Sequence, residues 1–310
     1  MKDFGEYRLI FMGTPSIAAR VFEALIQKGY HFVALIAQED KPVGRKGILE
    51  PVPTKVVAQK YNIPVYQPHK IRLDYEFVKE LKPDLILTMA YGQIVPQGLL
   101  DIPQFGCLNL HGSLLPKYRG AAPIQRAIID GEAKTGITLM EMVDKMDAGK
   151  MFAKEEVVIA PEDNYTSLCE KMSDAAIKVC IDNLPAYLDG KLHGEEQDES
   201  LVTIANKIKP DDEKLDLSKS TKEFIDYIRG LSEEPGGYIF IEDKKFKIFK
   251  AHKVDLPKKE VGCIEVNKNI YLHLKDGVIL LDKVQLEGKK KMDSKSFSNG
   301  NKMLNGKIAK

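Results

Sequence analysis

The chain has 310 residues, which is room for two domains, and it carries a net charge of +1 at neutral pH. Its 44% hydrophobic and 29% charged residues are typical of soluble globular proteins. Four scattered cysteines without a C-x-x-C pair argue against a disulfide framework and a zinc site, and no apolar run reaches membrane-spanning length. Because the start does not resemble a signal peptide either, we expect a cytoplasmic protein with no membrane segment and no metal.

The charge is unevenly distributed along the chain. Residues 241–310 contain 17 lysines, no arginine and 9 acidic residues, a net charge of +8, so the preceding residues carry −7. A lysine-rich segment of this kind favours an anionic partner. A solvated surface that binds no partner is the alternative.

The N-terminal part alternates between apolar strands and helices. Residues 8–12 predict a buried strand, residues 17–26 predict a helix that ends at Gly29, and residues 31–37 predict a second strand. Strand, helix and strand joined by tight turns form a βαβ unit, which requires a parallel sheet. No G-x-G-x-x-G follows the first strand and no G-K-[ST] occurs anywhere, which argues against NAD or ATP binding.

Residues 38–54 predict a long loop, because they contain two glycines and three prolines. The loop also carries the basic residues Lys41, Arg45 and Lys46. Loops of this length inside compact domains are usually functional or disordered. A solvated loop without a partner is therefore the alternative to a binding loop.

Helices are predicted at residues 54–61 and 71–81, and a buried strand at residues 84–90. A further strand at residues 107–111 ends at Gly112. Because side chains alternate along a strand, Asn109 and His111 point to the same side. An imidazole can move a proton and an amide can stabilise an oxyanion, so the pair suits acyl-type transfer to an incoming amine. A strand-end pair that only binds loop backbone is the alternative.

The second half begins with the same alternation and then changes. Residues 122–130 and 164–188 predict helices, and residues 136–142 and 150–159 predict strands. After a polar stretch and a helix at residues 221–231, short β segments follow at 237–241, 245–252, 262–266, 270–274 and 278–285. Their spacing predicts a small OB-like β-barrel.

Residues 109–124 read Asn-Leu-His-Gly-Ser-Leu-Leu-Pro-Lys-Tyr-Arg-Gly-Ala-Ala-Pro-Ile, which closely resembles the signature of the formyltetrahydrofolate-dependent formyltransferases. The similarity is greatest to the members that act on initiator tRNA. It covers nearly the whole chain and is weakest after residue 210, where residues 232–236 replace an Asn-Pro-type turn and tryptophan is missing. The resemblance implies an α/β fold: a Rossmann-like, mostly parallel sheet domain at residues 1–189, a linker at 190–210 and an OB-like β-barrel that binds tRNA at 211–310.

The resemblance also implies an activity and the residues that carry it. The chain would transfer a formyl group from 10-formyltetrahydrofolate to the α-amine of methionyl initiator tRNA, with Asn109 and His111 as catalytic residues. Asp147, in an Asp-x-Gly element, would hold His111, although an isolated aspartate is usually a plain turn residue. The residues implied to contact the folate are Met89, Tyr91, Ser113, Leu114, Leu115, Pro116 and Asp144. The residues implied to contact tRNA are Lys41, Arg45, Lys46, Lys289, Lys290 and Lys291.

Other functions on the same scaffold remain open at this point. A formyltransferase of a sugar-nucleotide amine can keep a similar C-terminal barrel, and a non-catalytic tRNA-binding protein would explain the lysines but not the Asn109, His111 and Asp147 set. An enzyme acting on glycinamide ribonucleotide would lack the second domain and need a glycine-rich phosphate loop, which residues 13–16 do not provide. Nothing in the sequence demands more than a monomer.

Overall fold

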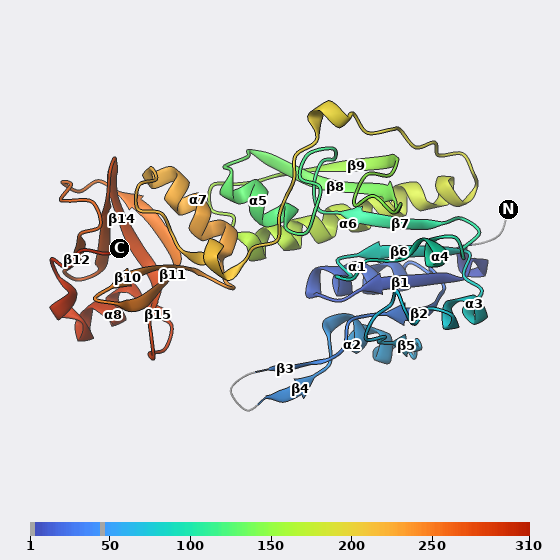
Figure 1. The fold of residues 1–310 in the computed structure, drawn as a ribbon, viewed down its shortest axis with the longest axis horizontal. Coiled ribbons are helices and arrows are strands. Elements are labelled where there is room, and N and C mark those ends of the chain that lie inside the picture. Colours follow the sequence, from blue (N-terminus) through green and yellow to red (C-terminus); the bar gives the residue numbers. More distant parts are fainter. Residues whose placement is uncertain (1–3, 44–46) are drawn as a thin grey trace. The chain divides into compact units, whose positions relative to one another are not determined.

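The computed structural model describes residues 4–43 and 47–310, so the predicted tRNA-binding residues Arg45 and Lys46 lie outside the described residues. The chain divides into two compact units (Figure 1). The first unit comprises Met1–Gly120, Thr135–Val158 and Cys169–Ile204, and the second comprises Ala121–Lys134, Ile159–Leu168 and Ala205–Lys310. Residues 190–204, which the sequence assigned to a linker, thus belong to the first unit.

A seven-stranded sheet in the order β5-β2-β1-β6-β7-β8-β9 forms the centre of the first unit (Figure 1). The neighbours from β5 to β7 pair in parallel, whereas β8 is antiparallel to β7. The strands are β1 (Leu9–Gly13), β2 (Phe32–Ile36), β5 (Val65–Tyr66), β6 (Leu85–Met89), β7 (Cys107–His111), β8 (Lys134–Glu141) and β9 (Met151–Val158). The predicted mostly parallel sheet is confirmed.

Helices cover both faces of this sheet, because the strands are apolar on both sides. Phe11 of β1 stacks on Phe22 of α1 with ring centroids 4.7 Å apart. Its neighbours Ile10 and Met12 pack on the other face, in a cluster that includes Leu99 of α4. This burial on both faces is typical of parallel sheets. The helices are α1 (Ser16–Gln27), α2 (Pro53–Lys60), α3 (Phe77–Leu81), α4 (Gln97–Leu100) and α6 (Tyr165–Leu188), which begins in the second unit.

Two predicted elements of the first unit differ from the structure. The helix expected over residues 71–81 is helical only in α3, and residues 70–74 form a separate turn in which the N–H groups of Leu73 and Asp74 donate to the carbonyl of Lys70. The loop expected over residues 38–54 contains a two-stranded antiparallel hairpin, β3 (Lys41–Val43) and β4 (Ile48–Glu50), which extends away from the sheet (Figure 1). Ladder pairs such as Lys41 with Glu50 order both arms of this segment.

The second unit contains a helix pair and an antiparallel barrel-like sheet in the order β10-β11-β14-β13-β12. Helices α5 (Pro123–Ile129) and α7 (Thr221–Leu231) pack closely, and a Cβ at Gly230 would lie 3.0 Å from the carbonyl oxygen of Gln125. The remaining elements are β10 (Gly237–Ile241), β11 (Lys244–Val254), β12 (Ile264–Val266), β13 (Ile270–Leu274), β14 (Gly277–Leu286), β15 (Met292–Asp293) and α8 (Ser294–Gly300). The predicted small β-barrel domain is confirmed.

The last residues of the chain join the two edges of this second sheet. Lys310 and Phe240 exchange two backbone hydrogen bonds of 2.9 Å, and the N–H of Ile264 donates to the carbonyl of Lys307 at 2.8 Å. Residues 307–310 therefore satisfy backbone groups of β10 and β12 that would otherwise be open edges. Among the residues that the structure describes, no helix combines the length and the apolar character needed to cross a bilayer.

Candidate active site

The site begins with two side chains on β7, at the carboxyl end of the parallel strands. Asn109 is paired with Thr88 of β6, and His111 is paired with Thr138 of β8. Both side chains leave the same face of the strand, as the sequence predicted. Asn109 is half-buried, whereas His111 is only 4% exposed. The carboxyl end of the strands is where open α/β sheets bind ligands.

The imidazole of His111 is fixed from two sides. Its Nε2 atom lies 2.8 Å from the carbonyl oxygen of Tyr118, and its Nδ1 atom lies 3.6 Å from Oδ2 of Asp147. Because a carbonyl oxygen can only accept, the contact with Tyr118 requires that Nε2 donates. Nδ1 is therefore the ring atom that can gain or lose a proton, and a proton there faces a carboxylate.

Asp147 lies in the loop between β8 and β9, and its carboxylate is also held by backbone. The N–H of Gly120 donates to Oδ2 at 2.8 Å. Gly120 lies in residues 112–122, between β7 and α5, which we call the signature loop. The oxygen that faces His111 is therefore bound by this loop as well. Asp147 itself has a left-handed backbone, with a φ of 50°. Gly149 completes the Asp-x-Gly element, because a Cβ there would overlap the carbonyl oxygen of Glu141. The structure therefore brings the three predicted catalytic residues together.

The loop that follows β7 is shaped by hydrogen bonds to its own backbone. Thr138 donates from Oγ1 to the carbonyl of Ser113 at 2.7 Å and accepts from the N–H of Leu115 at 3.1 Å. The hydroxyl of Ser113 donates to the carbonyl of Lys117 at 2.6 Å. At Tyr118 the backbone becomes left-handed, with a φ of 61°, which directs its carbonyl to His111. A left-handed aromatic residue is uncommon and costs free energy.

Sequence reasoning missed several residues of this site. Tyr118 and Gly120 act through backbone atoms, so only their place in the signature could have indicated them. Gln197 is 8% exposed, and its amide nitrogen lies 2.8 Å from the carbonyl oxygen of Asp147. Arg119 is buried and binds Glu199, and this contact, with a further one from Lys145, lowers the pKa of the Glu199 carboxyl to about 2.

The residues predicted to bind folate lie at the ends of β6 and β7 and in the loop before β9. Four of them are buried: Met89, Tyr91, Ser113 and Leu115. Leu114 and Pro116 are half-buried, and Asp144 is exposed. Within the described part of the chain, the buried Tyr91 hydroxyl has no hydrogen-bond partner.

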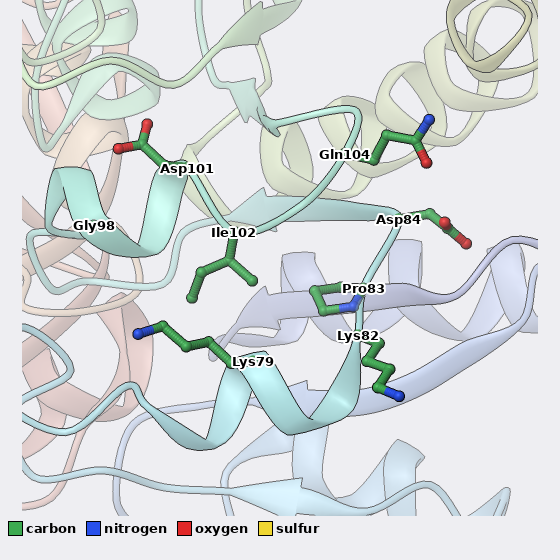
Figure 2. A pocket seen from close by; sticks show the side chains of 8 residues that line it. All are labelled: Lys79, Lys82, Pro83, Asp84, Gly98, Asp101, Ile102 and Gln104. Carbon is green, nitrogen blue, oxygen red and sulfur yellow. The ribbon is translucent and has the colours of Figure 1, made fainter.

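Two cavities of the first unit lie apart from these residues. One, of about 630 Å³, is lined by Lys79, Lys82 and Asp84 among others (Figure 2). Asp84 precedes β6, so this cavity lies at the amino edge of the parallel strands, opposite to the edge that carries His111. The other, of about 320 Å³, lies at the carboxyl edge and is lined by Gln38, His69, Lys70, Arg72, Gln93 and Ile94. Neither is lined by the predicted folate residues.

The residues predicted to bind tRNA are divided between the two units. Lys41 is exposed on β3 of the first unit. In the second unit Lys289 and Lys290 are exposed on the turn after β14. Lys291 is less available, because its ammonium lies 3.3 Å from a carboxylate oxygen of Glu233 and 3.7 Å from the ring centroid of Phe249.

Comparison with known proteins agrees with this geometry. The sequence profile described as formyl transferase matches residues 7–184, and that of the formyl transferase C-terminal domain matches residues 207–302. The methionyl-tRNA formyltransferase of Bacillus pumilus is 44% identical over 303 residues, which cover 94% of both chains. The corresponding protein of Bacillus subtilis is 42% identical over 299 residues, again 94% of both chains. The chain belongs to the methionyl-tRNA formyltransferase family. The resemblance stated from the sequence is confirmed, and the chain is a formyl transferase enzyme.

Solved structures share the fold of this chain, although their sequence identity to it is lower than that of the methionyl-tRNA formyltransferases above. HypX from Aquifex aeolicus, crystallised with tetrahydrofolic acid, has a TM-score of 0.70 at 17% identity, over 94% of this chain and 46% of that one. Methionyl-tRNA formyltransferase from Clostridium thermocellum has a TM-score of 0.56 at 21% identity, over 81% of this chain and 95% of that one. At these identities the likeness shows a shared fold.

Proposed function

We propose that the chain transfers the formyl group of 10-formyltetrahydrofolate to the α-amine of methionyl initiator tRNA, in translation initiation. The observation that carries this proposal is the His111 imidazole, whose Nδ1 atom lies 3.6 Å from the Asp147 carboxylate beside Asn109 on the same strand face. Family membership supplies the substrates, and this constellation supplies the proton transfer and oxyanion stabilisation that the reaction needs.

Each of the three side chains has a separate role in the proposed transfer. The neutral amine attacks the formyl carbon, and the Asn109 amide donates a hydrogen bond to the oxygen as it gains negative charge. Nδ1 of His111 takes the proton that the amine loses, and a proton returns to the folate nitrogen as its bond to the formyl carbon breaks. Asp147 stabilises the imidazolium that forms in between, as the aspartate behind the catalytic histidine does in serine proteases.

The binding roles remain proposals at the level of single residues. Met89, Tyr91, Ser113, Leu114, Leu115, Pro116 and Asp144 are proposed to contact the folate. The unpartnered Tyr91 hydroxyl supports a ligand or water nearby, because buried polar groups are normally hydrogen-bonded. Lys41, Arg45, Lys46, Lys289, Lys290 and Lys291 are proposed to contact tRNA phosphates. We further propose that the protein acts in the cytoplasm as a monomer, which light scattering of the purified chain would test.

A substrate comparison tests the proposed function. Purified protein is mixed with 10-formyltetrahydrofolate and either methionyl initiator tRNA or an amino sugar nucleotide, and formylated product is measured by mass spectrometry. We expect formylmethionyl-tRNA and no formylated sugar. Product from the sugar nucleotide alone would move the enzyme to another acceptor class, and no product from either acceptor would contradict the proposal.

A further inference from the structure

Residues 195–203, which we call the strap, run along the loops that carry the catalytic residues. At one end Glu195 and Met151 of β9 exchange two backbone hydrogen bonds of 2.8 Å. At the other end the carbonyl of Thr203 accepts from the N–H of Arg119 at 2.9 Å. The sequence suggested that this stretch is a linker, but both of its ends are anchored to the first unit.

Gln197 connects the strap to the Asp147 loop. Its amide nitrogen donates to the carbonyl oxygens of Asp147 and Gly149, both at 2.8 Å. Its amide oxygen accepts from Nε of Arg119 at 3.0 Å. Since Gln197 and Arg119 are both buried, water cannot readily replace these three hydrogen bonds. One side chain therefore joins the Asp147 loop to the signature loop.

Thr203 connects the strap to the other partner of His111. Its hydroxyl oxygen accepts from the N–H of Tyr118 at 2.8 Å. The carbonyl oxygen of the same Tyr118 accepts a hydrogen bond from the Nε2–H of His111. The strap thus binds both residues that contact the imidazole, Asp147 through Gln197 and Tyr118 through Thr203.

The backbone conformations show why such anchoring matters. Tyr118 and Asp147 both have positive φ, 61° and 50°, in the left-handed region that residues other than glycine rarely adopt. Such conformations persist only where surrounding contacts impose them, and they cluster at functional sites. Tyr118 and Asp147 are two of the seven described non-glycine residues with positive φ, and both contact His111. The strap supplies contacts to both.

We propose that Gln197 and Thr203 are positioning residues that set the distance between His111 and Asp147 for formyl transfer. This inference rests on the proposed function and deepens it, because it adds residues from a segment outside the signature. The two side chains act through Asp147 and Tyr118, so they govern the chemical step rather than the binding of either substrate.

The first test replaces Gln197 with methionine, which keeps the volume and removes all three hydrogen bonds. A catalytic group displaced by about 1 Å can lose ~100-fold in rate, so we expect Q197M to lower kcat by ~10- to 100-fold. The KM values for folate and tRNA should stay within about threefold, because binding contacts are retained. Ser200→Ala is the matched control, since this exposed strap residue uses its side chain for a hydrogen bond to Asp198, within the strap itself.

The second test compares two substitutions of Thr203. Because this side chain is exposed, we expect both variants to fold. Thr203→Val removes the hydroxyl acceptor and should lower kcat, whereas Thr203→Ser keeps it and should restore turnover. In both T203V and Q197M the ring resonances of His111 should shift in NMR spectra, but not in S200A. This readout needs no activity, so it separates a failure of the strap inference from a failure of the proposed function. Unchanged kcat with unchanged His111 resonances in Q197M, or a rise in KM alone, would overturn the inference.

Discussion

Single residues determine which atom of His111 can exchange a proton. The carbonyl of Tyr118 binds Nε2 at 2.8 Å, which leaves Nδ1 toward Asp147. The same oxygen of Asp147 faces His111 and accepts from the N–H of Gly120, so this backbone hydrogen bond holds the carboxylate in place beside the imidazole. The carboxylate thus has two roles: it accepts a hydrogen bond from Gly120, and its negative charge faces His111. A substitution that keeps the acceptor and removes the charge can separate these two roles.

Asp147→Asn tests the charge alone. The asparagine can still accept from the N–H of Gly120, but it cannot stabilise an imidazolium. We expect kcat to fall by at least ~100-fold with little change in either KM, as expected for a residue that acts in the transition state. Asp182→Asn, an exposed position on α6, serves as the control for loss of one negative charge. Turnover of D147N close to that of the unsubstituted enzyme would show that the charge is not used.

The sequence predicted part of this site and could not predict the rest. The two-residue period of a strand places Asn109 and His111 on one side, and the resemblance to the formyltransferases indicated Asp147 through its Asp-x-Gly element. Tyr118 could not be identified, because it contributes a carbonyl that every residue type has. Gln197 is 50 residues from Asp147 in sequence, and its role depends on a segment whose polar composition predicted only a linker.

Individual elements are stabilised by local contacts that can be tested separately. The N-terminus of α7 has a capping box, in which the Ser220 hydroxyl accepts from the N–H of Glu223 and the N–H of Ser220 donates to the Glu223 carboxylate. Hydrogen bonds from the Ser220 side chain and backbone hold the pKa of Glu223 at about 2. This cap satisfies two N–H groups that the helix itself leaves unpaired.

Ser220→Ala should lower the free energy of unfolding by about 1 kcal/mol, the usual cost of losing an N-cap side chain. The Glu223 contribution should depend on pH. Its pKa is lowered on folding, so its stabilisation is complete above about pH 4.5 and is lost as pH falls toward about 2. The difference in Tm between the unsubstituted chain and Glu223→Gln should therefore shrink over that range, as thermal scans would show. A difference that grows on acidification would contradict the assigned cap.

The order of elements was largely predictable, whereas some boundaries were not. Long periodic segments such as α6 and the strands of the parallel sheet were recognised from their apolar spacing. The helix expected over residues 71–81 begins only at Phe77, because residues 70–74 form a separate turn that the apolar spacing of the segment did not reveal. The β3–β4 hairpin was missed because its prolines and glycines are also typical of loops.

The charge asymmetry is a property of the whole molecule. Residues 241–310 carry a net charge of +8 within a chain of net charge +1. These lysines lie in the second unit, whose barrel-like sheet is completed by residues 307–310. That closure was not predicted, because it pairs the last residues with strands 40 or more positions earlier in the sequence.

The double substitution Lys289→Gln with Lys290→Gln tests whether this charge serves tRNA binding. Each lysine that contacts a phosphate contributes roughly 0.7–0.9 to the slope of log affinity against log salt concentration. We expect a higher KM for tRNA, an unchanged kcat and a shallower salt dependence. Lys28→Gln, at the exposed end of α1, is the matched control. Identical salt slopes in the double variant and the control would exclude these two lysines from the interface.

The rate of formyl transfer by Asn109→Ala and His111→Ala, measured with saturating methionyl initiator tRNA and 10-formyltetrahydrofolate, tests the central claim most directly. The loss of an oxyanion donor or of a general acid–base group lowers kcat by at least ~100-fold. We predict a loss of that size in both variants, with folding intact by circular dichroism. Turnover near that of the unsubstituted enzyme in either variant would contradict the account.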